Sequence, residues 1–548
     1  MRVLVFPARE FALRRRLFGA LAAVFPVAFV ARDGPSREAA DGWIEFAGDG
    51  GLAAPSDVRR LGFLPVQGRQ SGDGAGAVRF CDAARLDPRL RGQSIGGPLA
   101  VRQWSDGLDE RGEVLAYREE TAVWWASVAG GRRADLVADA PSELPPRESL
   151  REMCRSQPAA LLPLVQFLRD LTGYSDWRRP PLRAAFVIDD PNLHWPTYGF
   201  VDYAALARHA REHAYHVVLA TIPIDTWYTH DRAAALFRRS PSELSLTMHG
   251  HEHAHCELER LGSTAEAIAS LHTALARIER LERRARLTVS RVMVPPHGVC
   301  ADHVYAALVT TGFEALCREP AWWRDRTEAL QAVGGWGMAD LSHAGLPVLA
   351  RHLLTRADTA DELRVAAFLD QPMLAFCHAT DLAGGYERLA EVAAGVNAIG
   401  PARWAGLGEI ARSNYLTKVD GDRHLTVRMF ARRALVPVPD AITDMVVEFA
   451  CPSAPAGERI AAGGRWFALT RTSNGAISEP IPVSPGRPIE IRDETPLGTG
   501  ARPHRRRRPA ARIVMRRVAT EARDRVEPVA PRSALARALR RVKPGAGA

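Results

Sequence analysis

The sequence lacks paired cysteines. Its seven cysteines are scattered over 548 residues, their number is odd, and no Cys-x-x-Cys occurs. A disulfide framework, which holds many small secreted domains together, is therefore not indicated. Reduced thiols in a cytosolic protein fit this pattern best, so we expect a cytoplasmic location.

Long apolar runs are missing as well. No segment reaches the roughly 18 uninterrupted apolar residues that a membrane-spanning helix needs. An apolar stretch at residues 17–31 follows Arg14-Arg15-Arg16, and the protein would be secreted if this were a signal peptide. However, residues 2–6 have the pattern of a buried strand, and Phe29 stands where cleavage after Ala31 needs a small residue. We therefore predict a strand, a helix and a second strand over residues 2–31.

Net positive charge is absent from the first 500 residues. The chain carries a net charge of +9, but residues 501–548 alone contain 15 Lys or Arg against 3 Asp or Glu. The run Arg505 to Arg508 would suit contact with a nucleic acid or an anionic membrane, although a solvated tail is the simpler interpretation. We expect residues 498–548 to be a basic, mostly disordered tail, dispensable for folding, with short helices near 511–524 and 533–541.

The remaining composition is that of an ordinary globular protein, with 47% hydrophobic and 25% charged residues. Its length allows about three domains. Residues 1–175 mix short apolar strands with helices, and we expect an α/β domain of unknown role there. Residues 420–497 contain short alternating runs separated by Gly, Pro and Asn, which is typical of a small antiparallel, sandwich-like β domain.

Between these regions, residues 183–415 alternate between strand-like and helix-like segments after a Pro-containing linker at residues 177–182. This alternation predicts a parallel sheet or barrel. Strands are expected at 184–190, 216–222, 244–250, 292–296, 313–319 and 372–378, and helices at 200–214, 231–239, 264–286 and 301–311. Active residues would then lie at the carboxyl ends of the strands.

Ionisable or unusual residues stand at four of these strand ends. One strand runs into Asp189-Asp190, and two adjacent carboxylates are costly to bury unless they are paired or bind a cation. Another runs into four histidines, which supply nitrogen ligands for a metal: His249, His251, His253 and His255. The other two end on Pro295-Pro296-His297-Gly298 and on His378. Each feature alone has an ordinary structural explanation, but together they favour a metal site.

In this order the motifs resemble those of the polysaccharide-deacetylase (NodB-homology, carbohydrate esterase) superfamily. Its motifs are a strand ending in Asp-Asp, a strand ending in His-x-x-x-His, a strand leading to Pro-Pro-x-Gly, and a last strand ending in His. They match Asp189-Asp190, His249…His253, Pro295-Pro296-His297-Gly298 and His378, and the resemblance covers about residues 184–414. It implies a distorted (β/α) barrel that holds one divalent metal, with zinc as the expected ion.

The resemblance also implies a role for each matched residue. Asp190, His249 and His253 would bind the metal, Asp189 would be the general base, and His378 would be the general acid. The chain departs from the family where Pro191 replaces a Gly and Val294 replaces the Arg before Pro-Pro. The family's Asp-x-x-Asp-Trp motif is absent, with residues 322–325 as a poor substitute. Further candidates for the site are His255, His297, His194 and Asn192.

The sequence leaves alternatives for the ligands and for the function. A spacing of four fits both His249 with His253 and His251 with His255. The first pair is favoured because His249 directly follows the strand and Gly250 lets the chain turn back. The function is metal-dependent hydrolysis of an N- or O-acyl group on a carbohydrate-like substrate, or else metal or glycan binding by a non-catalytic module. The presence of both Asp189 and His378 favours the hydrolase.

Overall fold

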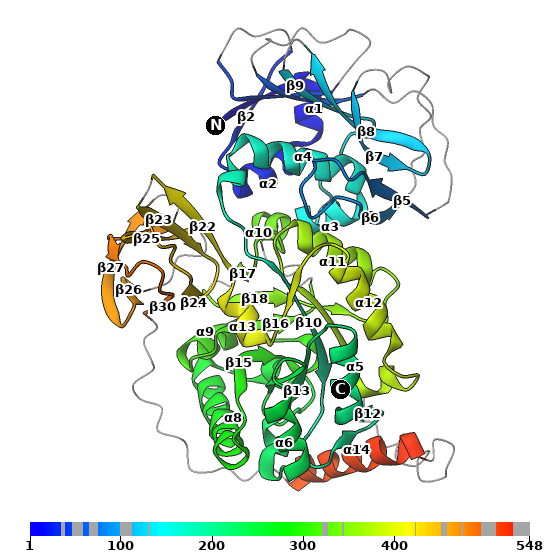
Figure 1. The fold of residues 1–548 in the computed structure, drawn as a ribbon, viewed down its shortest axis with the longest axis vertical. Coiled ribbons are helices and arrows are strands. Elements are labelled where there is room, and N and C mark those ends of the chain that lie inside the picture. The colour runs from blue at the N-terminus through cyan, green and yellow to red at the C-terminus, as the bar shows by residue number, and fades with distance from the viewer. Residues whose placement is uncertain are drawn as a thin grey trace. The chain divides into compact units, whose positions relative to one another are not determined.

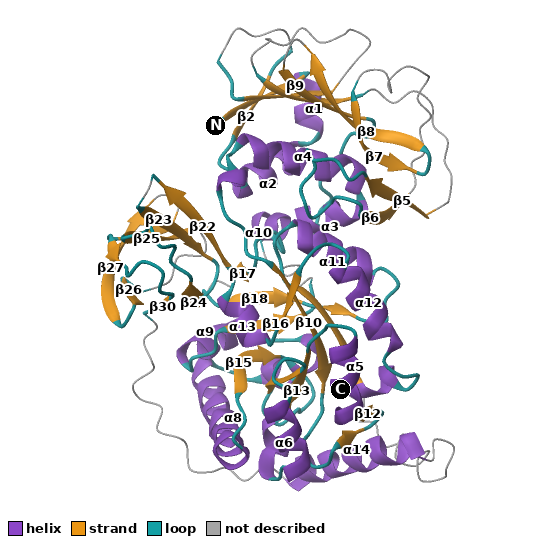
Figure 2. Cartoon of the chain, in the orientation of Figure 1, coloured by secondary structure: helices purple, strands orange, loops and turns teal. Residues whose placement is uncertain are grey.

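The structure is a computed structural model of the chain, shown in Figures 1 and 2. It describes residues 1–33, 39–46, 58–64, 75–98, 112–129, 132–320, 327–341, 345–421, 423–450, 457–472, 475–494 and 511–529. By its contacts the chain divides into two compact units. Unit 1 comprises residues 1–178, 320–337 and 360–370, and unit 2 comprises residues 179–319, 338–359 and 371–548.

Unit 1 is built on one nine-stranded sheet in the order β2-β1-β3-β4-β9-β8-β7-β5-β6. The first five strands in this order pair in parallel, and the remaining pairs are antiparallel. The strands are β1 (Arg2–Phe6), β2 (Ala28–Ala31), β3 (Gly42–Phe46), β4 (Arg59–Phe63), β5 (Ala75–Phe80), β6 (Ser94–Pro98), β7 (Glu113–Arg118), β8 (Thr121–Ala129) and β9 (Arg132–Val137).

Helices of unit 1 share one buried apolar cluster with this sheet. They include α2 (Arg15–Val24), α3 (Leu150–Ser156) and α4 (Pro158–Leu171). The strand, helix and strand expected over residues 2–31 are confirmed as β1, α1 (Ala8–Leu13) with α2, and β2, which pairs in parallel with β1. Among the described residues, no helix combines the length and the apolar character needed to cross a bilayer.

The central part of unit 2 is a ring of parallel strands. These are β10 (Leu182–Asp189), β13 (Val217–Thr221), β14 (Leu244–His249), β15 (Val289–Val294), β16 (Ala315–Arg318), β18 (Pro347–Ala350), β19 (His352–Leu353) and β20 (Met373–His378). Neighbours in this order pair in parallel, apart from β18 and β19, which pair with β16 and β20 respectively, and β20 also pairs with β10. Since only Arg351 separates β18 from β19, this segment closes the sheet into a barrel.

Helices surround the parallel strands, as Figure 1 shows. They are α5 (Tyr203–Glu212), α6 (Asp231–Arg239), α8 (Thr264–Ala285), α9 (Asp302–Thr310) and α12 (Glu387–Asn397). Every strand and helix expected between residues 184 and 378 is present, with bounds within three residues of those predicted. The parallel barrel of a mixed α/β chain is therefore confirmed, while the sequence analysis missed the closing strands β18 and β19.

A second sheet in unit 2 spans residues 415–493 in the order β22-β23-β25-β28-β27-β26-β30-β24, with β29 on β25. Alternate residues such as Leu425, Val427 and Met429 lie in its buried core, which accounts for the alternation in the sequence. One pair, β23 with β25, is parallel and departs from the expected antiparallel arrangement. The strands are β22 (Tyr415–Asp420), β23 (His424–Met429), β24 (Arg433–Val436), β25 (Asp444–Ala450), β26 (Arg459–Ala462), β27 (Arg465–Thr472), β28 (Gly475–Ser478), β29 (Ile481–Pro482) and β30 (Ile489–Asp493).

One helix of the C-terminal region, α14 (Ala511–Val529), is not solvated on all sides as expected for the tail. Arg517 and Asp524 on this helix are buried, with only 7% and 8% of each residue exposed. Polar partners in the barrel part of unit 2 offset the cost of burying these two charges. A count of charges along the sequence cannot reveal such partners. The run Arg505 to Arg508 and the second expected helix, at 533–541, lie outside the described residues.

Candidate active site and metal centre

The ionisable residues that end the strands lie at one rim of the barrel. Asp189 ends β10 and is the register partner of His378, which ends the neighbouring strand β20. His249 ends β14, which is separated from β10 by β13. Parallel strands bring their carboxyl ends to the same rim, so residues that are far apart in the sequence meet there.

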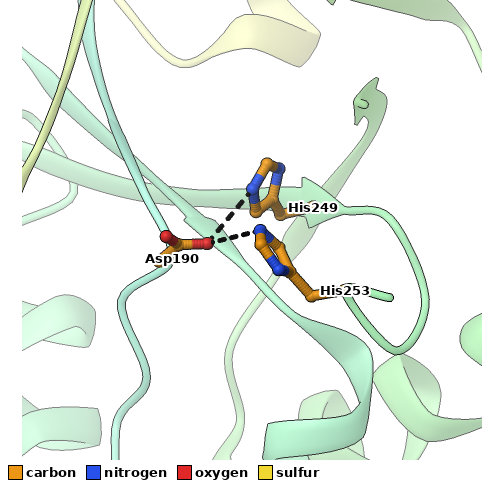
Figure 3. A group of neighbouring side chains, drawn as sticks. All are labelled: Asp190, His249 and His253. Carbon is orange, nitrogen blue, oxygen red and sulfur yellow. Dashed lines mark ion pairs between the residues drawn. The ribbon is translucent and has the colours of Figure 1, made fainter. Parts of the chain in front are cut away.

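Three side chains converge at this rim, as Figure 3 shows. The Oδ1 atom of Asp190 lies 3.3 Å from Nε2 of His249 and 2.9 Å from Nε2 of His253. The three ligand atoms that these residues offer lie within 4.8 Å of one another. Asp190 Oδ1 is shielded from solvent and makes no hydrogen bond of normal geometry. One carboxylate and two imidazoles that face a common point fit a divalent cation.

The imidazole of His249 is held in one orientation. Its Nδ1 donates a hydrogen bond to the backbone carbonyl of Val294, at 3.0 Å, so that Nε2 faces Asp190. Such a bond on the second ring nitrogen is typical of a histidine that binds a metal. Burial lowers the pKa of His249, but the carboxylates of Asp189 and Asp190 outweigh this and raise it above its usual value.

The carboxylate of Glu257, on α7 (Glu257–Arg260), organises the loop that carries His253. Its Oε1 accepts from the backbone N–H of His251 at 2.6 Å, and its Oε2 accepts from those of Glu252 and Ala254 at 2.9 and 3.2 Å. The loop can thus place His253, whose own φ is +54°, against Asp190. Glu257 is not among the residues expected from the sequence, since an acidic residue in a short helix has no distinctive pattern.

The other histidines of the loop point elsewhere. His251 is buried against α8, where its Nδ1 lies 2.8 Å from Ser270 Oγ and its Nε2 accepts from Arg277 at 2.8 Å. Burial and the charge of Arg277 lower the pKa of His251 to about 3. His255 is exposed, and its ring lies 5.0 Å from that of His297. Neither His251 nor His255 belongs to the convergent group, which consists of Asp190, His249 and His253.

A Gly250→Ala substitution is expected to disturb this loop. Gly250 has a φ of +60°, and an added Cβ would lie 2.0 Å from Glu257 Oε1 and 2.4 Å from Pro296 Cγ. We expect a loss of about 1–3 kcal/mol in the free energy of unfolding and weaker metal binding, measured by urea denaturation and metal titration. Gly395→Ala, in α12 with nothing within 4 Å, is the control and should be neutral or stabilising. Equal stability of the two variants would contradict this role of Gly250.

The second carboxylate, Asp189, is paired with an arginine that the sequence analysis did not identify. Arg351, between β18 and β19, donates two hydrogen bonds to the two carboxylate oxygens, at 2.7 and 2.8 Å. Both residues are almost completely buried. Burial raises the pKa of Asp189, but the charge of Arg351 outweighs it and lowers this pKa below its usual value. Asp189 is therefore an ionised carboxylate in a fixed orientation.

The positive charge that pairs with Asp189 thus comes from Arg351, between β18 and β19, and not from the position before Pro-Pro, where Val294 replaces the family's Arg. Arg351 had a detectable signal, because it is a charged residue inside the apolar run of residues 346–354. Residues 322–325, the poor substitute for the family's Asp-x-x-Asp-Trp motif, lie outside the described residues.

His378 is half exposed at the same rim, with 49% of its side chain accessible. Its backbone N–H donates to Asp381 Oδ2 at 2.8 Å, and its Nδ1 lies 3.7 Å from the same oxygen. Because Asp381 lies beside Nδ1, the other nitrogen, Nε2, is the one available to a substrate. Asp381 is a further residue that the sequence analysis missed.

The remaining candidates lie outside the group of three. Asn192 and His194 are buried in the loop after β10, where Asn192 Oδ1 accepts from the backbone N–H of His194 at 3.1 Å. The ring of His194 contacts Glu521 and the backbone carbonyl of Asp225. His297 is exposed, with its ring 5.1 Å from that of His253. Of the four additional residues, His297 is the nearest in ring contact to the convergent group.

Asp189, Asp190 and His378 line one cleft of about 450 Å³, which includes space open to solvent. Its other lining residues come from the loop after β10, the turn after β20 and helix α14: Tyr198, Gly199, Phe200, Ala379, Thr380, Arg523 and Asp524. The two carboxylates, of which Asp190 belongs to the candidate metal site, and the exposed histidine thus face the same space.

No family model matches the chain, and neither does any curated protein. Among solved structures the chain is similar to Agd3, described as a novel carbohydrate deacetylase, with 10% identity, a TM-score of 0.46, and coverage of 90% of this chain and 98% of that one. It is also similar to a putative polysaccharide deacetylase from Mycobacterium smegmatis, with 15% identity, a TM-score of 0.31, and coverage of 43% and 91%. A third structure is BA3943 from Bacillus anthracis, a CE4 family pseudoenzyme, with 12% identity, a TM-score of 0.26, and coverage of 42% and 66%.

The structural comparison thus returns deacetylases and related proteins, the class that the sequence motifs resemble.

Proposed function

We propose that the protein is a metal-dependent hydrolase that removes an N- or O-acyl group, such as acetyl, from a carbohydrate-like substrate. One observation carries this proposal. Asp190, which forms a convergent group with His249 and His253, lines the same cleft as an arginine-paired carboxylate, Asp189, and an accessible imidazole, His378. A module that only binds metal or glycan needs the first group but has no need of the other two residues.

Each residue has a chemical task in this proposal. Asp190, His249 and His253 would hold a divalent cation, which polarises an acyl carbonyl and makes water a stronger acid when bound. The Asp189 carboxylate accepts the proton of the attacking water, because Arg351 keeps it ionised and oriented. His378 donates a proton from Nε2 to the leaving nitrogen or oxygen, with Asp381 beside its other ring nitrogen.

Zinc is the proposed cation because two imidazole nitrogens and one carboxylate oxygen are a common ligand set for catalytic zinc. Such a set leaves coordination positions for water and substrate. We further propose that the barrel supplies all three protein ligands. They come from the ends of β10 and β14 and from the loop that follows β14.

Removal of the metal is expected to abolish turnover. Full-length protein would be treated with a chelator, then reloaded with Zn²⁺ or Co²⁺, and assayed for acetate released from acetylated chito- and xylo-oligosaccharides. The chelated protein should lose at least about 100-fold in activity, since the cation supplies several kcal/mol of transition-state stabilisation, and metal should restore it. Metal-independent release of acetate would contradict the proposal. Stoichiometric metal binding and glycan binding without turnover would favour the non-catalytic module.

A further inference from the structure

Helix α14 is attached to the barrel part of unit 2 through buried polar contacts. Arg517 forms an ion pair with Asp225, on the loop after β13, with Arg517 Nε 3.1 Å from Asp225 Oδ2. Each side chain of this pair is only 8% exposed. A buried charge is costly unless it is paired, so the side chains of Arg517 and Asp225 require each other. This contact fixes the helix against the rim where the catalytic candidates lie.

Three more contacts fix the direction of the helix along the rim. Arg516 donates to the backbone carbonyl of the proposed metal ligand His253. Glu521 lies 3.1 Å from Nδ1 of His194. The buried hydroxyl of Tyr198 donates to Asp524 Oδ2 at 2.7 Å. In Figure 1, α14 is the red helix at the bottom of the view.

The helix borders the cleft and does not fill it. Arg523 and Asp524 line the same space as Asp189, Asp190 and His378. His378 nevertheless keeps 49% of its side chain exposed with α14 in place. A helix that blocked the site would bury this imidazole. Helix α14 therefore lies along one side of the cleft and leaves the site open.

We propose that α14 forms one wall of the substrate cleft and that Asp524 binds the sugar that carries the acyl group, through a hydroxyl or amide hydrogen. This inference rests on the proposed hydrolase function and adds a substrate-binding residue to it. Asp524 Oδ2 accepts from Tyr198, and Oδ1 lies 2.7 Å from Arg523 Nε and 2.6 Å from Arg523 Nη2, which fixes the carboxylate in one orientation. A carboxylate has about four acceptor positions, and these three contacts leave about one of them, on Oδ2, for a sugar donor.

The chain offers a matched control on the opposite face of the same helix. Met515 and Val518 are 66% and 61% exposed, and neither lines the cleft. A substitution such as Val518→Ala changes the helix without touching its barrel-facing side. If α14 acts through the cleft, Val518→Ala should therefore behave like the wild-type protein.

The first arm of the test measures whether α14 is seated as described. The helix contains several arginines, so trypsin should cut within residues 511–529 quickly once the helix leaves the barrel. In full-length protein, Arg517→Ala should be cut at least tenfold faster than wild type there, and Val518→Ala should be cut at the wild-type rate. Equal cutting rates for wild type and Arg517→Ala would overturn the placement of the helix.

The second arm measures substrate binding in the metal-loaded, full-length protein. Asp524→Asn should raise KM for an acetylated chito-oligosaccharide about tenfold, which corresponds to about 1.4 kcal/mol, while kcat changes less than twofold. Val518→Ala should keep both constants, and Asp524→Glu should restore part of the KM. A purely structural role would lower kcat and the melting temperature and leave KM unchanged. Unchanged KM in Asp524→Asn, with active wild type, would overturn this inference alone, whereas an inactive wild type would overturn the proposed function as well.

Discussion

An Asp190→Ala variant is expected to lose its bound metal and to fall about 1000-fold or more in turnover. Asp190 supplies the carboxylate of the convergent group, and its Oδ1 atom lies within 3.3 Å of both imidazole nitrogens. Without this negative charge the two neutral imidazoles hold a divalent cation far less tightly. The loss of the cation's several kcal/mol of transition-state stabilisation corresponds to roughly a thousandfold in rate. Metal content after gel filtration and acetate release would both be measured.

The histidine variants of the same loop are the internal controls for this prediction. His249→Ala and His253→Ala should lose metal as Asp190→Ala does. His251→Ala and His255→Ala should keep it, because His251 faces Ser270 and Arg277, and His255 is exposed outside the group. If the second pair lost metal and the first pair kept it, the ligand assignment would be wrong. If no variant lost metal, the hydrolase proposal would fail at its first step.

Much of the barrel could be predicted because its strands are short apolar runs between amphipathic helices. The runs before Asp189, His249 and His378 are buried as β10, β14 and β20, and each ends at or within one residue of the point expected. Parallel pairing then requires these ends to lie at one rim. The candidate residues could therefore be grouped from the sequence, although no distance between them was known.

The choice between the two histidine pairs depends on tertiary contacts. Both pairs have the same spacing, so the local sequence supports either one. In the structure Arg277 and Ser270, both on α8, engage the ring of His251. These partners follow His251 by 26 and 19 residues, and no local rule of spacing connects them to it.

Long-range charge pairs were the part that sequence reasoning could not supply. Arg517 pairs with Asp225 across 292 residues, and Tyr198 bonds to Asp524 across 326 residues. In the sequence, Arg517 and Asp524 belong to a tail whose high charge and few apolar residues are typical of a solvated segment. Charge content alone cannot distinguish a solvated arginine from one that has a buried partner, because the two have the same local pattern.

The arginine opposite Asp189 leads to the second large expected effect. Arg351→Met should lower the free energy of unfolding by about 3–5 kcal/mol, because it leaves an uncompensated carboxylate in a buried site. Asp189 and Arg351 are 3% and 2% exposed, so solvent cannot replace the lost partner. Turnover should fall as well, because the proposed base is no longer held ionised and in place. Urea denaturation and acetate release would measure the two effects.

A second substitution separates the loss of the charge pair from a general packing defect. In Asp189→Asn/Arg351→Met the buried negative charge is gone, so most of the lost stability should return although the protein stays inactive. Double-mutant analysis should therefore give a large coupling energy between the two positions, since they form one buried pair. Arg351→Lys keeps the charge but not the two parallel hydrogen bonds, and should be intermediate in stability. If the double variant were as unstable as Arg351→Met, the arginine would act through packing against Phe376, whose ring lies 4.0 Å from its guanidinium, and not through Asp189.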